Sequence, residues 1–179
     1  DARYQRLAGQ TPAIAADQYI SGMHVHLGFT DLEVAVRALN GLRGWLPVLV
    51  AIGANSPVWR GVESGFESWR SIHYRRWMTN GVPPHFQDLH DYDSRVAMLT
   101  AFDAVESPAS LSWLARLSHR HDTLEIRACD VQLEAQDSVA IAVLTRALAN
   151  YALETPPAVA FTQEYLDIAL WQSARWGLS

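Results

Sequence analysis

Hydrophobic and polar positions alternate with a period of two in two stretches of the chain, which is the pattern of β-strands. Between Gln18 and Thr30, one set of alternating positions runs from Tyr19 to Phe29, and the other contains His24 and His26. Residues 123–130 place Leu124, Ile126 and Ala128 on one face and polar residues on the other. A further strand is expected over residues 110–117.

A helical period predicts the remaining regular elements. The most apolar helix should follow Asp31, a typical N-cap, and run to about residue 54 with a kink at Pro47. Other helices are expected over 88–102, from about 137, and over 162–176, with Pro156 and Pro157 separating the last two. Glycines and prolines make 58–87 irregular. Strands mixed with helices predict an α+β fold, with an antiparallel sheet packed against helices in a single domain, 1–179.

Composition narrows the range of functions. Of 179 residues, 49% are apolar and 18% charged, with a net charge of −5, which disfavours nucleic acid and anionic lipid as partners. All fourteen basic residues are Arg, so Lys-dependent phosphate loops and Schiff-base enzymes are excluded. One Cys excludes an internal disulfide and multi-cysteine metal sites. No apolar run approaches the ~20 residues that span a bilayer, so we expect a cytoplasmic protein.

Two imidazoles share one face of the first strand. His24 and His26 are two residues apart, and Gly22 and Gly28 beside them would let a ligand approach closely. Such a pair suits a divalent metal or an anion. The alternative is that both are hydrogen-bonded structural residues, and the pair alone does not decide between these interpretations.

The second alternating strand presents a carboxylate beside a guanidinium. Glu125 and Arg127 share its polar face, either as a surface ion pair or as a metal ligand next to a phosphate clamp. Cys129 is interpreted as a small buried hydrophobe without a chemical role. Arg60 and Arg70 lie in the irregular segment, where they either bind carboxylate or phosphate groups or cover apolar surface. The His-rich turn 119–122 is expected to be solvated.

Several motifs together resemble a known enzyme family. Ser-Gly-Met-His-Val-His at 21–26 is similar to a signature of the glutamine synthetase superfamily. The chain further resembles the carboxylate–amine ligases, or type 2 glutamate–cysteine ligases, in motifs that follow the family's order: Arg3-Tyr4-Gln5, 54–61 (Ala-Asn-Ser-Pro-Val-Trp-Arg-Gly), Trp69-Arg70-Ser71, Thr123-Leu124-Glu125-Ile126-Arg127 and 174–178 (Ala-Arg-Trp-Gly-Leu).

The resemblance implies a glutamine synthetase-like catalytic fold, present here in part, and an ATP- and Mg²⁺-dependent ligase. Such an enzyme joins glutamate to cysteine through an acyl phosphate, although the cysteine acceptor follows from the family name alone. Carried over by motif, the expected roles are metal ligation by His24 and Glu125, ATP phosphate contacts by His26, stabilisation of phosphate or acyl phosphate by Arg127, and binding of substrate carboxylate or phosphate by Arg60 and Arg70.

One departure from the family leaves two other hypotheses open. Family members are about twice as long and begin with a strand carrying a Glu-x-Glu metal-binding pair, which this sequence lacks. The chain therefore resembles the central portion of the enzyme, with about half of the metal shell, so that a complementing chain or a homo-oligomer is expected as partner. The alternatives are a non-catalytic remnant or subunit, and a zinc hydrolase that uses His24 and His26.

Overall fold

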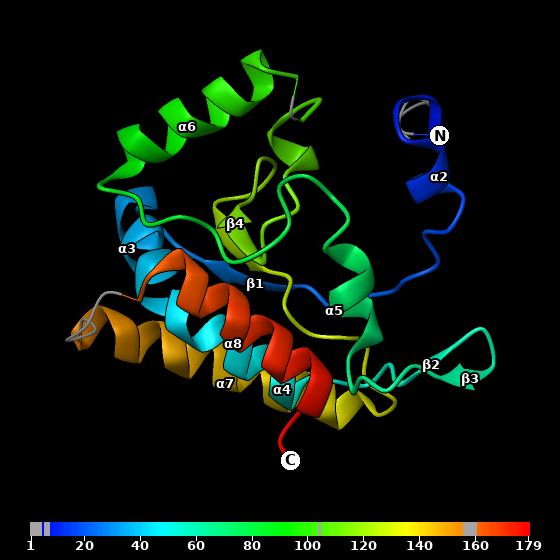
Figure 1. The fold of residues 1–179 in the computed structure, drawn as a ribbon. Helices are drawn as coiled ribbons and strands as arrows, with labels where there is room; N and C mark the ends of the chain where they lie inside the picture. The colour runs from blue at the N-terminus through cyan, green and yellow to red at the C-terminus, as the bar shows by residue number, and fades with distance from the viewer. Residues whose placement is uncertain (1–4, 6–7, 104, 156–160) are drawn as a thin grey trace.

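A three-stranded antiparallel sheet forms the centre of the computed structural model, which describes residues 5, 8–103, 105–155 and 161–179 (Figure 1). The strand order is β1 (Val25–Gly28), β5 (Thr123–Ile126), β4 (Ala115–Leu117). In this register Glu125 on the central strand pairs with His26 on one side and Arg116 on the other. The antiparallel sheet and the α+β class predicted from the sequence are confirmed.

One face of the sheet is covered by four helices that pack as a layer (Figure 1). These are α3 (Leu32–Leu42), α4 (Leu46–Ile52), α7 (Ala135–Glu154) and α8 (Gln163–Trp176). The strands turn their buried apolar side chains toward the helices, which leaves the polar side chains on the opposite face: the buried set is Val25, Leu27, Ala115, Leu124 and Ile126. Burial of this apolar set fixes the register, because a slip by one residue would exchange the two faces.

The long apolar helix begins as predicted and is interrupted close to the predicted kink. Asp31 caps α3 by accepting a hydrogen bond from the backbone N–H of Glu33. A 3₁₀ turn, η1 (Arg43–Trp45), separates α3 from α4, and Pro47 lies in the first turn of α4, where it needs no N–H partner. Against our expectation, the continuous stretch Leu32–Ile52 has the length and hydropathy of a membrane span, but 56% of its most apolar window is buried in this fold, as in the core helix of a globular domain.

The helix layer depends on one close contact between backbones. Gly41 of α3 faces Ala152 of α7, and a Cβ built on Gly41 would lie 2.5 Å from the Ala152 Cβ. Since carbon atoms do not approach to that distance, a glycine is needed where the two helices meet.

The other elements surround the polar face and the sheet edges. They are α2 (Pro12–Ala15), β2 (Val58–Trp59), β3 (Val62–Glu63), α5 (Trp69–Tyr74), α6 (Leu89–Ala101) and η2 (Pro108–Ser110). The short hairpin and α5 fall in the segment that was predicted to be irregular. The strands predicted over 18–30, 110–117 and 123–130 are shorter in the structure. Before β1, an isolated bridge joins Gly22 to Asp130. The resemblance at Arg3 and Tyr4 and the prolines at 156 and 157 lie outside the described residues.

Candidate active site

The carboxylate of Glu125 is the centre of a hydrogen-bonded group on the polar face of the sheet. Its Oε1 accepts from Nδ1 of His24 at 3.0 Å and from Nη1 of Arg127 at 2.7 Å, and its Oε2 accepts from Nε of Arg116 at 2.8 Å. Since a carboxylate can only accept, the contact with His24 is a hydrogen bond when Nδ1 carries the proton. We call Glu125, His24, Arg116, Arg127 and Tyr74 the Glu125 cluster.

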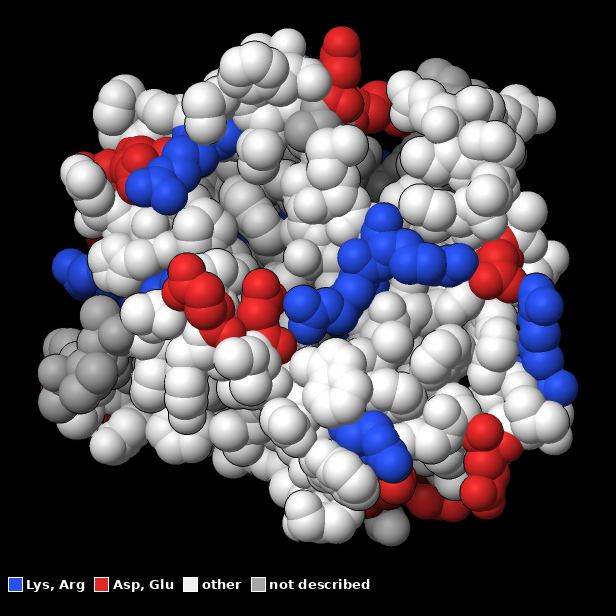
Figure 2. All heavy atoms as spheres, in the orientation of Figure 1, with Lys and Arg blue, Asp and Glu red and all other residues white. Residues whose placement is uncertain are grey.

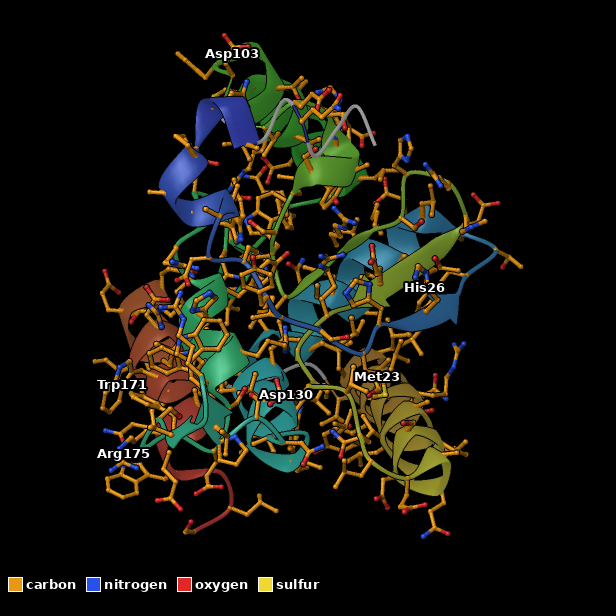
Figure 3. All side chains as sticks on the ribbon, turned by 90° about the vertical axis from the view of Figure 1, so that its right-hand side faces the viewer. Met23, His26, Asp103, Asp130, Trp171 and Arg175 are labelled. Carbon is orange, nitrogen blue, oxygen red and sulfur yellow. The ribbon has the colours of Figure 1, made fainter. Side chains whose placement is uncertain are left out.

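Strand alternation brings His24 and Glu125 together, as the sequence predicted, whereas Tyr74 joins the cluster from α5. Val25 and Leu27 are buried against the helices, which turns His24 and His26 to the other face, where Glu125 and Arg127 also lie. Figure 3 shows Met23 beside α7, whereas His26 lies against the sheet. The ladder continues beyond β1 through the hydrogen bond from the Met23 N–H to the Cys129 carbonyl, which carries His24 alongside Glu125.

Arg127 is held from two sides, and one of its three nitrogens has no partner among the described residues. Besides the bond to Glu125, its Nη2 donates to the Tyr74 hydroxyl at 2.9 Å, while its buried Nε has no partner among the described residues. Burial alone would lower the pKa of Arg127, but the electrostatic attraction and hydrogen bonds of Tyr74 and Glu125 outweigh it and raise that pKa. Arg127 is therefore a permanent cation with a fixed orientation, which suits it to an anionic group.

Arg116 is a member of the cluster that the sequence analysis missed. Its Nη1 donates to the carbonyls of Pro108, Ala109 and Leu111, so it ties the turn before β4 to Glu125. Cross-strand charge pairing was the available signal, because Arg116 lies directly opposite Glu125 in the register. The loop contacts of this buried side chain indicate a positioning role.

The cluster carries more positive than negative charge. Burial would raise the pKa of Glu125, but the hydrogen bonds from His24 and Arg116 and the charges of Arg116 and Arg127 outweigh it and hold that pKa far below its usual range. Glu125 is thus a carboxylate between two guanidiniums. The two Arg charges exceed the one Glu charge, so the cluster has a net charge of at least +1 even when His24 is neutral. Such a surplus in a partly buried place favours a bound anion.

The described residues do not complete a magnesium or zinc site. His24 and Glu125 meet as the sequence predicted, but they are joined by a hydrogen bond, and both Glu125 oxygens are already bound to Arg. Mg²⁺ takes about six oxygen ligands and zinc about four ligands. Within the described part of the chain, no group of three or more His, Cys, Asp or Glu side chains could hold a metal ion. The metal-ligand roles of His24 and Glu125 stay predictions.

His26 lies on the same face as the cluster but bonds elsewhere. Its Nδ1 is 2.9 Å from the Thr123 hydroxyl, and its ring meets that of His121 edge-on with centroids 6.4 Å apart. The turn that carries His121 is exposed, as expected. His26 is therefore free to contact a ligand over the sheet, and its assignment to ATP stays a prediction.

Arg70 and Arg60 have other partners. Arg70 is buried, and its Nε and Nη2 donate to Asp130 and to the Ala128 carbonyl at 2.6 and 2.5 Å. Arg60 is exposed at the tip of the β2–β3 turn with a positive φ of 50°, and it pairs with Asp17. Among the contacts of the described residues, none joins the Arg60 side chain to Glu125 or Arg127.

Cys129 is buried and inert, as the sequence suggested. Its thiol donates to the Leu49 carbonyl at 3.3 Å, and burial raises its pKa to about 12. A thiol with so high a pKa is not a nucleophile near neutral pH. The absence of a role for Cys129 in the predicted chemistry agrees with this environment.

Comparison with known proteins relates the chain to a family. A sequence model described as glutamate–cysteine ligase family 2 matches residues 1–179. The chain is 40% identical over 180 residues to a protein of Nocardia farcinica whose provisional name is glutamate–cysteine ligase 2-1, covering 98% of the chain and 47% of that protein. It is 37% identical over 181 residues to a provisionally named glutamate–cysteine ligase 2 of Rhodopirellula baltica, covering 99% and 49%. The chain thus spans about half the length of the curated relatives it matches.

Proposed function

The chain belongs to glutamate–cysteine ligase family 2, and from this premise we propose that the protein is an ATP-dependent carboxylate–amine ligase. The substrates proposed are glutamate and an amine, with cysteine as the acceptor that the relatives' names give. Family membership supports the reaction class. Among the described residues, the Glu125 cluster contains the groups that would take part in the reaction.

The proposed reaction has two steps. A carboxylate oxygen of glutamate attacks the γ-phosphorus of ATP, which forms an acyl phosphate and releases ADP. The amine nitrogen then attacks the acyl carbon, forms the amide and expels phosphate, while the amine loses a proton. Both steps build negative charge on phosphate oxygens, which fixed cationic donors stabilise.

The observation that carries this proposal is the excess of fixed cationic donors around one carboxylate. Arg127 would hold a phosphate or acyl-phosphate oxygen, since its guanidinium is oriented by Glu125 and Tyr74. His24 has an exposed ring beside it, and His26 borders the same surface. Glu125 positions His24 and Arg127, and Arg116 in turn holds Glu125 in place.

Magnesium would neutralise phosphate charge in such a reaction. Among the described residues, His24 and Glu125 would be ligands of the ion, but they do not complete its coordination. No step is therefore assigned to the ion. Further carboxylate ligands would have to come from elsewhere in the complete enzyme.

Nucleic acid and membrane are not among the proposed partners. On the face shown in Figure 2, the Arg side chains lie close to Asp and Glu side chains, so they do not form a continuous basic area. The most apolar helical stretch is largely used for the core. We place the protein in the cytoplasm, where ATP and free amino acids are available. A homo-oligomer, or a complementing chain that supplies the missing metal ligands, stays a prediction.

Phosphate release tests the proposal. The protein, with whatever sequence its gene encodes on either side of these residues, should release phosphate only when ATP, Mg²⁺, glutamate and an amine are all present. His24→Ala should reduce the rate by about 100-fold or more, as the loss of a group at the reacting phosphate does, whereas His119→Ala, in the exposed turn, should not.

Two outcomes would count against it. Undiminished phosphate release by His24→Ala and by a folded Glu125→Ala variant would remove the site assignment. No phosphate release by the wild-type protein with any amine would favour the non-catalytic subunit hypothesis.

A further inference from the structure

Arg127, which would hold phosphate in the proposed reaction, lies just beyond the end of a strand. β5 ends at Ile126, and residues 127–129 belong to no strand of the described sheet. A group that acts on a reacting atom has to be held within about 0.5 Å of its productive position. Segments outside the sheet must therefore contribute to fixing Arg127.

The short helix α5 holds Arg127 at two points. At the start of the helix, Nη2 of Arg70 donates to the carbonyls of Ala128 and Arg127, at 2.5 and 3.3 Å. At its end, the Tyr74 hydroxyl accepts from Nη2 of Arg127 at 2.9 Å. One helix thus contacts both the backbone and the guanidinium of Arg127, so a displacement of α5 would displace Arg127 as well.

α5 is too short to be stable without support from its surroundings. It has 6 residues, Trp69–Tyr74, whereas isolated helices below ~12–15 residues are marginal in water. Its N-cap is Ser68, whose side chain accepts a hydrogen bond from the Ser71 N–H. Contacts that fix Ser68 and Arg70 therefore fix the helix.

The carboxylate of Asp130 makes those contacts. Its Oδ1 accepts from Nε of Arg70 and from the Ser68 hydroxyl, at 2.6 and 2.9 Å. Its Oδ2 accepts from the Asn55 N–H and the Ser56 hydroxyl, at 2.8 and 2.7 Å. Asp130 is 2% exposed and lies beside the end of α4 (Figure 3). One buried carboxylate therefore joins the start of α5 to the loop after α4 and to the extension of β5.

The surroundings of Arg70 suit a structural link better than a substrate ligand. Its side chain is 5% exposed, and its charge is matched by Asp130. Gly22 packs against the guanidinium, because a Cβ built on Gly22 would lie 3.1 Å from Nη1 and 3.3 Å from Cζ. Arg70 and Asp130 both line a pocket of about 250 Å³, so an anion that entered it would meet the carboxylate together with the guanidinium.

We propose that Asp130 is a positioning residue, which sets Arg127 through Arg70 and α5, and that Arg70 belongs to this support and does not bind substrate. The inference rests on the proposed function, in which Arg127 holds phosphate. It replaces the substrate-binding role that the family resemblance implies for Arg70, and it gives Ser56 and Ser68 a part in the same support.

The position of Arg127 can be measured without turnover. NMR detects the Nε–H signals of the fourteen Arg residues, and Arg127→Lys identifies the signal of Arg127. The chemical shift of this signal reports the geometry of the folded state. Asp130→Asn, which offers an amide N–H to the surrounding donors, should shift it by more than its line width. Ser68→Ala changes no charge and should shift it in the same way.

A control separates positioning from a general loss of stability. Gly41→Ala perturbs the contact of α3 with α7, away from α5, through a Cβ that would lie 2.5 Å from the Ala152 Cβ. It should leave the Arg127 signal where it is in the wild type. Circular dichroism confirms folding in each variant, and Ser68→Ala carries the test if Asp130→Asn does not fold.

Kinetics distinguish the two roles of Arg70. In the complete protein, Arg70→Lys keeps a positive charge, but one ammonium group cannot replace the fork that joins Asp130 to two carbonyls. If Arg70 positions Arg127, kcat for phosphate release should fall about tenfold or more while KM for glutamate stays within about threefold. If Arg70 binds the substrate carboxylate, KM for glutamate should rise instead. Asp130→Asn should resemble the first case, and Gly41→Ala should change neither constant.

Two results would overturn the proposal. One is an unchanged Arg127 signal in the folded Asp130→Asn or Ser68→Ala variant. The other is a higher KM for glutamate with an unchanged kcat in Arg70→Lys. A wild-type protein that releases no phosphate would contradict the proposed function, and the NMR comparison would still decide whether Asp130 sets the position of Arg127.

Discussion

Nδ1 of His24 lies 3.0 Å from Oε1 of Glu125, although the residue paired with Glu125 across the ladder is His26. The interaction is therefore diagonal, between residues offset by two positions on neighbouring strands. It leaves His26 free to bond Thr123 at the strand end. The two imidazoles of one motif thus have different partners, one inside the Glu125 cluster and one at its border.

Replacing the central carboxylate should destabilise the fold. Glu125→Gln leaves Arg116 and Arg127 buried beside a neutral amide, and loss of one partner from a buried ion pair costs roughly 3–5 kcal/mol. Urea unfolding at neutral pH, monitored by circular dichroism, should show this decrease in the free energy of unfolding. A change below about 1 kcal/mol would mean that the two ion pairs contribute little.

The contribution of Glu125 to the free energy of unfolding should decrease as the pH falls. Its pKa is depressed in the folded state, so its stabilisation is complete above the unfolded-state value of about 4.3 and declines as the pH falls from there toward the folded pKa. The difference in unfolding free energy between wild type and Glu125→Gln should be larger at neutral pH than near pH 3. A difference that grew on acidification would contradict the assigned shift.

Tyr74→Phe should disturb Arg127 while leaving the fold intact. The substitution removes the acceptor for Nη2 of Arg127, a hydrogen bond to a charged group worth about 1.5–3 kcal/mol. We expect a lower rate of phosphate release with an unchanged circular dichroism spectrum. Tyr151→Phe, on an exposed ring of α7, is the matched control and should behave like the wild type; an unaltered rate in Tyr74→Phe would show that Tyr74 does not orient Arg127.

The contact between α3 and α7 should tolerate only one Cβ. Gly41→Ala places a methyl group 2.5 Å from the Ala152 Cβ, and overpacking of this kind costs about 1–3 kcal/mol. The double variant Gly41→Ala/Ala152→Gly should recover part of the lost stability in thermal unfolding, because it returns the space. Equal stability of Gly41→Ala and wild type would indicate that the helices separate readily.

Cys129 should resist modification in the folded protein. Its buried thiol has a pKa of about 12, so the thiolate is scarce at pH 8. Ellman's reagent should react with Cys129 at least about 100-fold faster in denaturant than in buffer, at a rate set by local opening. Rapid reaction in buffer would contradict the packing of Cys129 against Leu49.

The sequence was sufficient to predict which side chains of each strand face the helices and which form the polar face of the sheet. Alternation of Val25 and Leu27 with His24 and His26, repeated by Leu124 and Ile126 around Glu125, predicted that the polar groups would meet, because the apolar sets have only one buried side to share. The predicted cap at Asp31 is also observed, because a helix N-cap is a local signal in the sequence.

Contacts between distant segments were beyond the reach of such patterns. The contacts of Arg70 with Asp130 and of Arg127 with Tyr74 depend on tertiary packing, and they join positions with no sequence periodicity in common. For the same reason, strand lengths were overestimated: residues 18–21 alternate like a strand but lie in no strand of the described sheet.

A double-mutant cycle tests the central claim most directly, that His24 and Glu125 act as one site. Phosphate release would be measured for wild type, His24→Gln, Glu125→Gln and the double variant, with folding checked in each. The account predicts that each single variant loses most of the rate and that the double variant loses little more, since the two groups act through one contact. Strictly additive losses, or a single variant with the wild-type rate, would contradict it.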